Sequence, residues 1–343
     1  MKKILLDKNL NKYKANLHCH STVSDGRLTP EELKNYYMEN GYSIIAYTDH
    51  DIMIAHDELN DEGFLALHGY EMEFDEGGSY GADRKTCHIC LIQRDPTDMR
   101  QICWHRSKYV HGISRNYLHL IQFDNSLPDF ERYYTPECIS EVMRCGRENG
   151  FFVTYNHPTW SLEMYEDYMK FDGMHAMEIF NYSCYVDGYE EYNARVYDDM
   201  LRGGKKIYCI AADDNHNGYP LDSKYNDSLG GFTVIFSESL SYRSVTDALF
   251  DGNFYASQGP EIYSLTYEDG KVHIECSPAQ RIIITTNSRG FEEIRNKNTG
   301  ADELLTEADY NLSKTDKYFR ITVFDKSGKI ANTNAYRIEA LIK

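Results

Sequence analysis

The sequence contains no long hydrophobic run. Every apolar segment is shorter than the roughly 18 residues that a membrane-spanning helix needs. The first residues, Met1 to Asp7, contain only three apolar side chains in a row before the aspartate, which is too few for a signal peptide. We therefore expect a cytoplasmic protein without a membrane partner.

Positive charge is also scarce. The 36 lysines and arginines are outnumbered by 54 aspartates and glutamates, so the formal net charge is −18, and no Lys/Arg cluster offsets it. Such a surface repels the phosphate backbone and disfavours long nucleic acids as partners. A small anionic substrate remains compatible, because bound metal ions reverse the field locally.

Several catalytic and redox signatures are missing. The sequence has no glycine-rich phosphate loop and no nucleophilic serine elbow. Nine cysteines without a signal peptide predict free thiols. Cys87 and Cys90 form a C-x-x-C pair without a second pair, and residues three apart in a strand point to opposite faces. We therefore expect buried structural thiols rather than a metal chelate.

The first 258 residues alternate strand-like and helix-like segments. Strands are expected over 14–17, 43–48, 64–73, 86–93, 151–155, 175–180, 206–212, 231–237 and 254–257. Helices are expected over 29–40, 98–110, 135–149, 187–202 and from 241, with an irregular segment over 111–134. Thr29, Pro30 and Glu32 form a capping-box start for the first helix. Seven or eight strand–helix units favour a barrel over an open sheet.

The pattern changes after residue 258. Strands are expected over 262–267, 271–276, 281–286, 318–324 and 334–340, with Asp269-Gly270 as a hairpin turn and 326–329 as another turn. We therefore expect two domains: an α/β barrel over 1–258 and a small all-β domain over 259–343.

Side chains that bind metals recur at the ends of the predicted strands. They are His18, His20 and Asp25; Asp49, His50 and Asp51; Glu71 and Glu73; His88; His157; and Asp213, Asp214 and His216. In barrel enzymes the carboxyl ends of parallel strands form the active face. Imidazole mixed with carboxylate suits zinc, manganese or iron, whereas a magnesium or calcium site would be mostly oxygen. Each motif alone is weak, and their joint order carries the prediction.

The motifs "NLHCHSTVSDGRLTPEEL", "GYSIIAYTDHD", "GYEME", "CHICL", "YNHP" and "DDNH" occur in this order between residue 14 and about 258. This region resembles the polymerase and histidinol phosphatase (PHP) superfamily of metallohydrolases. The stretch "DGNFYASQGPEI" and the β-rich tail resemble its carbaryl-hydrolase-like subgroup. The resemblance implies a distorted (β/α)₇ barrel with two or three divalent ions, Mn, Zn or Fe. The metal ligands it implies are His18, His20, Asp25, His50, Glu71, His88, His157, Asp214 and His216.

The leading hypothesis is a phosphoesterase that acts on a small phosphorylated substrate through metal-activated hydroxide. Asp25, His50 and His216 are the expected catalytic residues. Arg27 is the expected substrate contact, although a structural role fits it equally. Three ligand carboxylates against four or six metal charges should leave the site net positive. Asp49 is expected to orient a ligand, and Glu73 competes with Glu71 because the two share a strand face.

Three alternatives stay open. The same metals could serve a carboxylic or carbamic ester hydrolase, which an apolar, aromatic pocket without a cationic phosphate clamp would favour. An exonuclease acting on short oligonucleotides is compatible with the charge. A non-catalytic metal-binding module is the third. The sequence leaves the substrate, the native metal, the number of ions and the oligomeric state open.

Overall fold

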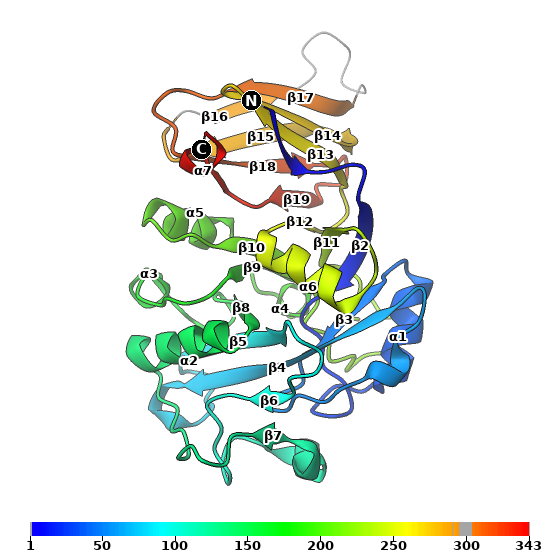
Figure 1. Ribbon diagram of the computed structural model, residues 1–343, viewed down its shortest axis with the longest axis vertical. Coiled ribbons are helices and arrows are strands. Elements are labelled where there is room, and N and C mark those ends of the chain that lie inside the picture. The colour runs from blue at the N-terminus through cyan, green and yellow to red at the C-terminus, as the bar shows by residue number, and fades with distance from the viewer. Residues whose placement is uncertain (1, 290, 295–303, 343) are drawn as a thin grey trace.

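The computed structural model describes residues 2–289, 291–294 and 304–342, with only the backbone described for 291–294. It is a mixed α/β structure in which helices flank a large curved sheet, and a smaller sheet lies at one end (Figure 1). The strands that carry the candidate site and their neighbours are β2 (Asn11–Asn16), β3 (Ile44–Tyr47), β4 (Leu65–Asp75), β5 (Thr86–Gln93), β8 (Phe151–Tyr155), β9 (Ala176–Asn181), β10 (Tyr208–Ala212), β11 (Phe232–Ser237) and β12 (Phe254–Ser257). All lie within a few residues of the predicted strands.

The large sheet is mixed rather than fully parallel. Its order is β10-β9-β8-β5-β4-β3-β2-β11-β12, and it continues into strands of the C-terminal part. β2, β3 and β4 are parallel, as are β8, β9 and β10, whereas β5 is antiparallel to both neighbours and β11 is antiparallel to β2. Among the described residues, the strand ladders do not close a barrel. A single bridge between Cys19 and Asn215 links the segment after β2 to the segment after β10.

The strands and helices follow from their side chains. β3, β5, β8, β9 and β11 are buried along their whole length, as expected for apolar strands covered on both faces. The helices are α1 (Pro30–Glu39), α2 (Pro136–Glu148), α3 (Tyr165–Tyr168), α4 (Tyr182–Val186), α5 (Ala194–Arg202), α6 (Tyr242–Asp251) and α7 (Ile338–Leu341). α1 begins with the predicted capping box, in which Thr29 and Glu32 each accept the other's backbone N–H.

The helix expected over 98–110 is wrong. The structure has the short strand β6 (Arg100–Gln101) followed by irregular chain, and β6 pairs with β7 (Gln122–Phe123) beyond a 3₁₀ helix over Gly112–Leu120. The Asp98 carboxylate accepts hydrogen bonds from the backbone and guanidinium of Arg100, which offers this segment an alternative to a helix. Cys103 and Tyr109 have positive φ values of 47° and 70°, which no α-helix accommodates.

The helix expected over 187–202 is correct only for its second half. α4 ends at Val186, Gly188 has φ 101°, and α5 begins at Ala194. Between them, the buried Glu191 accepts hydrogen bonds from the backbone N–H groups of Thr159 and Trp160, so a tertiary contact holds this segment in a non-helical path.

The C-terminal part consists almost entirely of strands. They are β13 (Ile262–Glu268), β14 (Lys271–Ala279), β15 (Arg281–Thr286), β16 (Phe291–Ile294), β17 (Leu305–Asn311), β18 (Tyr318–Phe324), β19 (Ile330–Thr333) and β20 (Tyr336–Arg337). β13 and β14 form the predicted hairpin, with Asp269 and Gly270 both at positive φ. The strand expected over 334–340 is wrong beyond β20, because Ile338–Leu341 form α7.

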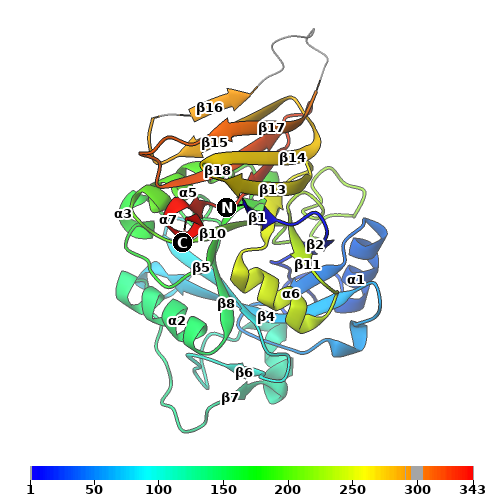
Figure 2. The ribbon, with the colours of Figure 1, turned by 45° about the horizontal axis from the view of Figure 1, so that its top comes forward.

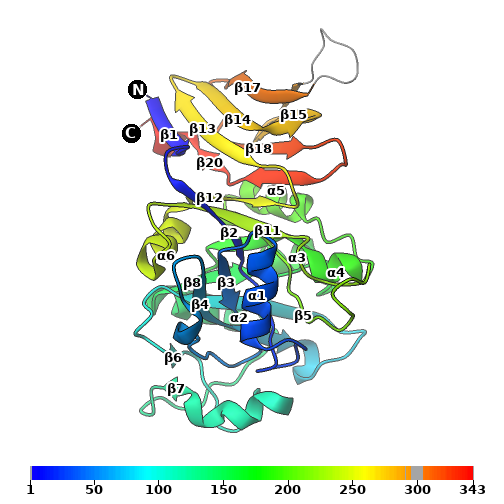
Figure 3. The same ribbon diagram turned by 90° about the vertical axis from the view of Figure 1, so that its right-hand side faces the viewer.

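Both chain ends lie beside this C-terminal part. The first strand, β1 (Lys2–Leu6), pairs with β13 in a sheet of order β1-β13-β14-β17. Figures 2 and 3 show both ends of the chain next to these strands. β19 pairs with β12, so the C-terminal strands also extend the large sheet. The expectation of a boundary at residue 258 did not include this return of the N-terminal strand.

Two negative findings concern the described residues. None of the helices there has the length and apolar character to cross a bilayer. The nine cysteines are free, and Cys87 and Cys90 are both buried on β5, as predicted for structural thiols.

Candidate metal centre

The nine predicted ligands converge on one region of the structure. Each belongs to at least one of four groups in which candidate ligand atoms lie within 4.8 Å of one another. The groups are His20, Asp25, His50 and His216; His18, His20, Glu71 and Asp214; His18, His157 and Glu178; and Glu71, His88 and His157. They come from the ends of β2, β3, β8 and β10 and from within β4, β5 and β9. Shared members make the four groups one continuous centre, and no other such group occurs in the described residues.

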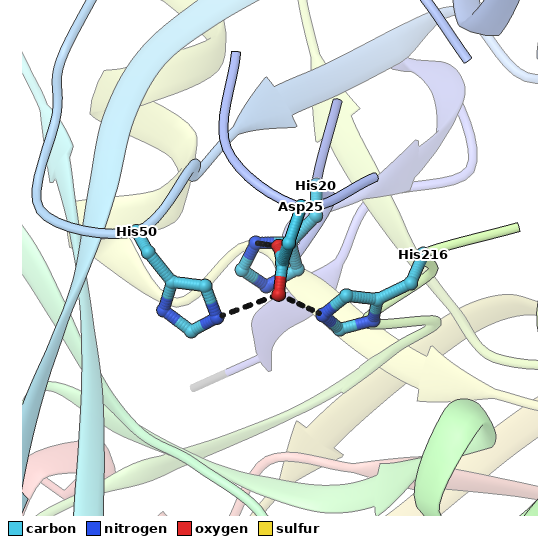
Figure 4. A group of neighbouring side chains, drawn as sticks. All are labelled: His20, Asp25, His50 and His216. Carbon is cyan, nitrogen blue, oxygen red and sulfur yellow. Dashed lines mark ion pairs between the residues drawn. The ribbon is translucent and has the colours of Figure 1, made fainter. Parts of the chain in front are cut away.

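The outermost group surrounds Asp25 (Figure 4). Its carboxylate lies 3.7 Å from His20 Nδ1, 3.7 Å from His50 Nε2 and 3.6 Å from His216 Nε2. The Asp25 side chain is 55% exposed, whereas that of His20 is fully buried. The ring of His20 stacks on that of His216 with a centroid separation of 4.3 Å. This group is therefore the part of the centre that faces solvent.

The side chains of the inner group are buried. Asp214 Oδ1 lies 3.1 Å from His18 Nε2 and 3.0 Å from His20 Nε2, and Glu71 Oε1 lies 3.1 Å from His18 Nε2. Ligands about 2.1 Å from one ion at angles of 90–110° are separated by roughly 3.0–3.4 Å. The inner atoms therefore have the spacing of a coordination shell.

The carboxylate of Glu71 lies close to more of the histidines than any other carboxylate of the centre. Its Oε1 also lies 3.2 Å from His88 Nδ1 and 3.4 Å from His157 Nε2, and its Oε2 lies 3.3 Å from His50 Nδ1. Glu73 lies further out, with its carboxylate 3.9 Å from His88 Nε2, and burial raises the pKa of Glu73 to about 7. Of the two glutamates, Glu71 has the ligand position in this arrangement.

The centre concentrates charge in a buried space. Burial opposes ionisation of Glu71, but the neighbouring His18 and His88 outweigh it and hold the Glu71 pKa well below its usual range. Burial also opposes protonation of His18 and His20, yet Asp214 and Glu71 raise the pKa of both rings. His50 is different, because burial and the adjacent His20 lower its pKa to about 3. Buried ionised carboxylates are stabilised by nearby cations. Divalent ions would supply that positive charge and would replace the protons on the His18 and His20 rings.

Glu178 is a member that sequence reasoning missed. It lies within β9 and is fully buried, and its Oε1 accepts a hydrogen bond from His18 Nδ1 at 2.7 Å. Its other oxygen accepts from the backbone of His157 at 3.0 Å and from Asn181 Nδ2 at 2.9 Å. A carboxylate behind a ligating histidine fixes the ring and its tautomer. The available signal was a glutamate inside an otherwise apolar strand, Ala-Met-Glu-Ile-Phe.

The carboxylate of Asp49 contacts the serines that lie between His20 and Asp25, and its expected role in orienting a ligand stays a prediction. This carboxylate accepts hydrogen bonds from the backbone and hydroxyl of Ser21, at 2.8 Å each, and from those of Ser24, at 3.1 and 2.7 Å. These bonds hold the turn that separates His20 from Asp25.

The two other aspartates beside the motifs have structural contacts. Asp51 forms a buried ion pair with Arg132. Asp213 accepts hydrogen bonds from the Tyr37 hydroxyl and from the backbone N–H groups of residues 229–231, while burial raises its pKa to about 7. Neither belongs to a ligand group in the described residues.

A cavity of about 440 Å³ opens onto the centre. Its carboxyl groups are those of Asp25, Glu71, Glu73, Asp187, Asp214 and Asp227, and no lysine or arginine is among the described residues that line it. The expected net positive charge was counted over the three ligand carboxylates alone. The cavity adds the carboxyl groups of Glu73, Asp187 and Asp227, and burial raises the pKa of Glu73 to about 7, so the sign of the filled site stays a prediction.

Arg27 lies beside the centre. Its side chain is exposed, and its backbone N–H donates to the carbonyl oxygen of His216 at 2.9 Å. Arg27 does not line the cavity as the structure describes it, so its contact with substrate stays a prediction.

Comparison with known proteins yields only partial likenesses. No family model matches the chain. A 5'-3' exoribonuclease of Haemophilus influenzae is 47% identical over 45 residues, which are 13% of this chain and 16% of that protein. The match thus spans less than a fifth of the length of that relative.

Three solved structures are similar to the chain at low identity. A two-domain protein from Bacteroides vulgatus containing a predicted PHP-like metal-dependent phosphoesterase has 15% identity and a TM-score of 0.44, covering 97% of this chain and 96% of its own. A protein from Bifidobacterium adolescentis assigned as a metal-dependent phosphoesterase has 18% identity and a TM-score of 0.40, covering 62% and 91%. An amidohydrolase from Chromobacterium violaceum with bound sulfate and no metal has 17% identity and a TM-score of 0.37, covering 59% and 87%. None of these likenesses by itself assigns the chain to a family.

Proposed function

We propose that this chain is a metal-dependent hydrolase that cleaves phosphate esters of small molecules. One observation carries the proposal: adjacent ligand groups share Glu71 and His20, and seven of the nine ligands line one cavity. Shared ligands would hold two or three ions side by side, which is the arrangement that suits displacement at phosphorus. The ligand set and the catalytic roles of Asp25, His50 and His216 belong to this proposal.

The residues fit divalent ions. His20, Asp25, His50 and His216 would hold one ion, and His18, Glu71, His88, His157 and Asp214 would hold the others. Bound ions of this kind supply Lewis acidity, which activates water and stabilises negative charge on the reacting oxygens. In the hydrolysis, water adds to phosphorus, the bond to the ester oxygen breaks, and the departing alcohol takes up a proton.

Hydrogen bonds prepare the rings for ligation. His18 Nδ1–H donates to Glu178, so its Nε2 points into the centre. His216 Nδ1–H donates to the carbonyl oxygen of Asp214 at 2.9 Å, which leaves its Nε2 facing Asp25. Both rings are therefore held in the orientation that ligation needs, and an ion would take the place of any proton on Nε2.

A carboxylic or carbamic ester hydrolase is the second candidate. The observation that favours it is the cavity wall, which includes Trp160, Tyr219 and Tyr225 but no described lysine or arginine. The 45-residue similarity to an exoribonuclease supports the third candidate, activity on short oligonucleotides. The carboxyl groups of the same wall oppose a polyanionic chain.

The test is hydrolysis by protein stripped of metal and reloaded separately with Mn²⁺, Zn²⁺ or Fe²⁺. Released alcohol is measured for an aryl phosphate, an aryl carboxylic ester and an aryl carbamate, and released nucleotide for a dinucleotide. We expect turnover of the aryl phosphate, its loss in His20→Ala, and its retention in His273→Ala, a histidine in the C-terminal sheet. Bound metal without turnover of any phosphate ester would contradict the proposal.

A further inference from the structure

The cavity has a second set of lining residues besides the ligands. It consists of three carboxyl groups, those of Glu73, Asp187 and Asp227, together with four aromatic side chains, and we call it the wall. The aromatic residues are Tyr80, Trp160, Tyr219 and Tyr225. Carboxylates and ring faces both attract cations, and neither attracts the phosphate of a substrate.

The carboxyl groups of this wall are available to a ligand to different degrees. Among the described residues, Asp187 is exposed and has no side-chain hydrogen bond or ion pair, and the ion pair of Glu73 is with His88, at 3.9 Å. Asp227 is held in place, because its carboxylate accepts backbone hydrogen bonds from His216 at 2.7 Å and from Asn217 at 3.0 Å. All three line the same cavity as the ligand groups.

Contacts with neighbouring side chains hold three of these aromatic rings in the cavity wall. Trp160 packs edge-on against the rings of His88 and His157, with centroid separations of 5.4 and 5.0 Å. The rings of Tyr219 and Tyr225 pack against each other, with their centroids 5.5 Å apart. The Tyr225 ring already contacts a cation, since the ammonium group of Lys224 lies 4.7 Å from its centroid.

From these observations we propose that the substrate is a phosphate monoester of an amino alcohol, with its ammonium group held by the aromatic and acidic wall while its phosphate meets the ions. The inference rests on the proposed function. It also accounts for the missing cationic clamp, because the ions neutralise the phosphate. A neutral or anionic leaving group would meet three carboxyl groups without compensation. Asp187 and Trp160 are then specificity-determining residues.

Binding can be tested without turnover. The chain has two tryptophans, so Trp104→Phe leaves Trp160 as the only one, and its fluorescence reports on the cavity. Choline and its neutral isostere 3,3-dimethylbutan-1-ol are titrated into this variant with and without Mn²⁺. A desolvated cation–π contact corresponds to a preference of about tenfold or more for choline. Equal affinity for the two alcohols would overturn the inference.

Selectivity is tested with phosphocholine and 3,3-dimethylbutyl phosphate as matched substrates. We expect a kcat/KM ratio of about 10 or more in favour of phosphocholine, carried mainly by KM. Asp187→Asn should lower this ratio several-fold. The neighbouring Glu190→Gln removes one charge from an exposed residue that does not line the described cavity, and it should leave the ratio unchanged. Lys224→Ala frees a face of Tyr225 and should raise the ratio.

The outcomes separate this inference from the proposed function. If aryl phosphate is not cleaved by metal-loaded protein, the proposed function fails, and the choline titration still decides the inference. If aryl phosphate is cleaved while both matched substrates react equally, the inference fails alone. A fall in activity toward every phosphate ester in Lys224→Ala would make Lys224 a phosphate contact and would also overturn it.

Discussion

Glu178 shows how one buried side chain supports a metal centre. Its hydrogen bonds to His18 Nδ1 and to the backbone of His157 connect two ligand positions that are 139 residues apart in the sequence. Such outer contacts typically contribute a factor of 10 to 100 to metal affinity. They do so by orienting the ring and raising its basicity.

We therefore expect Glu178→Gln to weaken metal binding by about 10- to 100-fold, because the amide keeps the size of the side chain but loses its charge. Competition with a coloured chelator measures the affinity, and circular dichroism checks the fold. Glu307→Gln, an exposed change on β17, is the matched control and should bind metal like the wild type. Unchanged affinity in Glu178→Gln would show that this carboxylate does not tune the centre.

A second residue-scale prediction concerns pH and lies outside the centre. His175 is buried, stacks on Phe152, and accepts a hydrogen bond from the Val153 backbone at Nδ1. Burial and the charge of Arg147 lower the pKa of His175 from its usual 6.5 to about 3. Below pH 6.5, His175 binds a proton in the unfolded chain but stays neutral in the folded chain. The free energy of unfolding therefore falls as the pH drops toward 3.

The slope from this group is at most about 1.4 kcal/mol per pH unit. His175→Asn keeps an acceptor near the Nδ1 position and does not titrate, so its free energy of unfolding should fall less between pH 6.5 and 4. Urea unfolding at several pH values measures this difference. Parallel curves for the two proteins would rule out a role for His175.

At the scale of elements, the loop between β2 and α1 carries His20 and Asp25 through a tight turn. A Cβ added to Gly26 would lie 2.5 Å from the carbonyl oxygen of His20 and 2.8 Å from the backbone nitrogen of Ser21. Both are backbone atoms, so the loop itself would have to move. The turn is otherwise held by Asp49, which contacts Ser21 and Ser24.

Gly26→Ala should therefore displace Asp25 and reduce both metal affinity and kcat by tenfold or more, on the order of the loss expected when a supporting contact is removed. Gly63→Ala is the control, since its nearest atoms lie 3.4 Å or further away and include the flexible end of Met38. Isothermal titration with Mn²⁺ compares the two variants. Wild-type affinity in Gly26→Ala would show that the loop relaxes without consequence.

Elements differ in how well the sequence predicts them. Segments with a strong local pattern were predicted within a few residues, including α1 with its capping box and the fully buried β5 and β8. The prediction of a helix over 98–110 was wrong, because a local Asp98–Arg100 contact and the positive φ values of Cys103 and Tyr109 oppose a helix. The prediction for the first half of 187–202 was wrong, because the Glu191 carboxylate accepts a backbone hydrogen bond from a loop about 30 residues earlier in the chain.

At the scale of the whole molecule, a buried ion pair joins α5 to the C-terminal strands. Arg320 on β18 makes two hydrogen bonds to Asp198, at 2.8 and 3.0 Å, with side-chain exposures of 5% and 15%. Removing one partner of such a pair leaves the other charge buried without compensation, which costs about 3–5 kcal/mol.

Asp198→Asn should accordingly lower the free energy of unfolding by about 3 kcal/mol, and Arg320→Met in the same chain should restore part of the loss. Arg243→Met breaks an exposed pair with Asp247 and should change stability by less than about 1 kcal/mol. Urea denaturation compares the three variants. Equal losses for the buried and exposed pairs would contradict the role of Asp198 in joining the two parts.

Metal removal should also act on the whole molecule. The ligand groups join β2, β3, β4, β5, β8 and β10, so ions that bind only the folded chain stabilise all of these strands together. Free metal at 1,000 times the dissociation constant should raise the free energy of unfolding by about 4 kcal/mol. Differential scanning calorimetry with and without chelator measures this shift, which His20→Ala should reduce. A metal-independent melting temperature in the wild type would contradict a centre of this kind.

The sequence by itself showed that histidines and carboxylates follow the predicted strands, because the end of each apolar run marks where a strand ends. That pattern nominated a wider set of candidates, from which the resemblance to the PHP superfamily selected nine, and the structure brings these nine into one centre. Only the tertiary structure decided that Glu178 supports His18, that β1 pairs with β13, and that the cavity wall is acidic and aromatic. These depend on contacts between residues tens to hundreds of positions apart. Local patterns do not encode such contacts, because they form only when the whole chain packs.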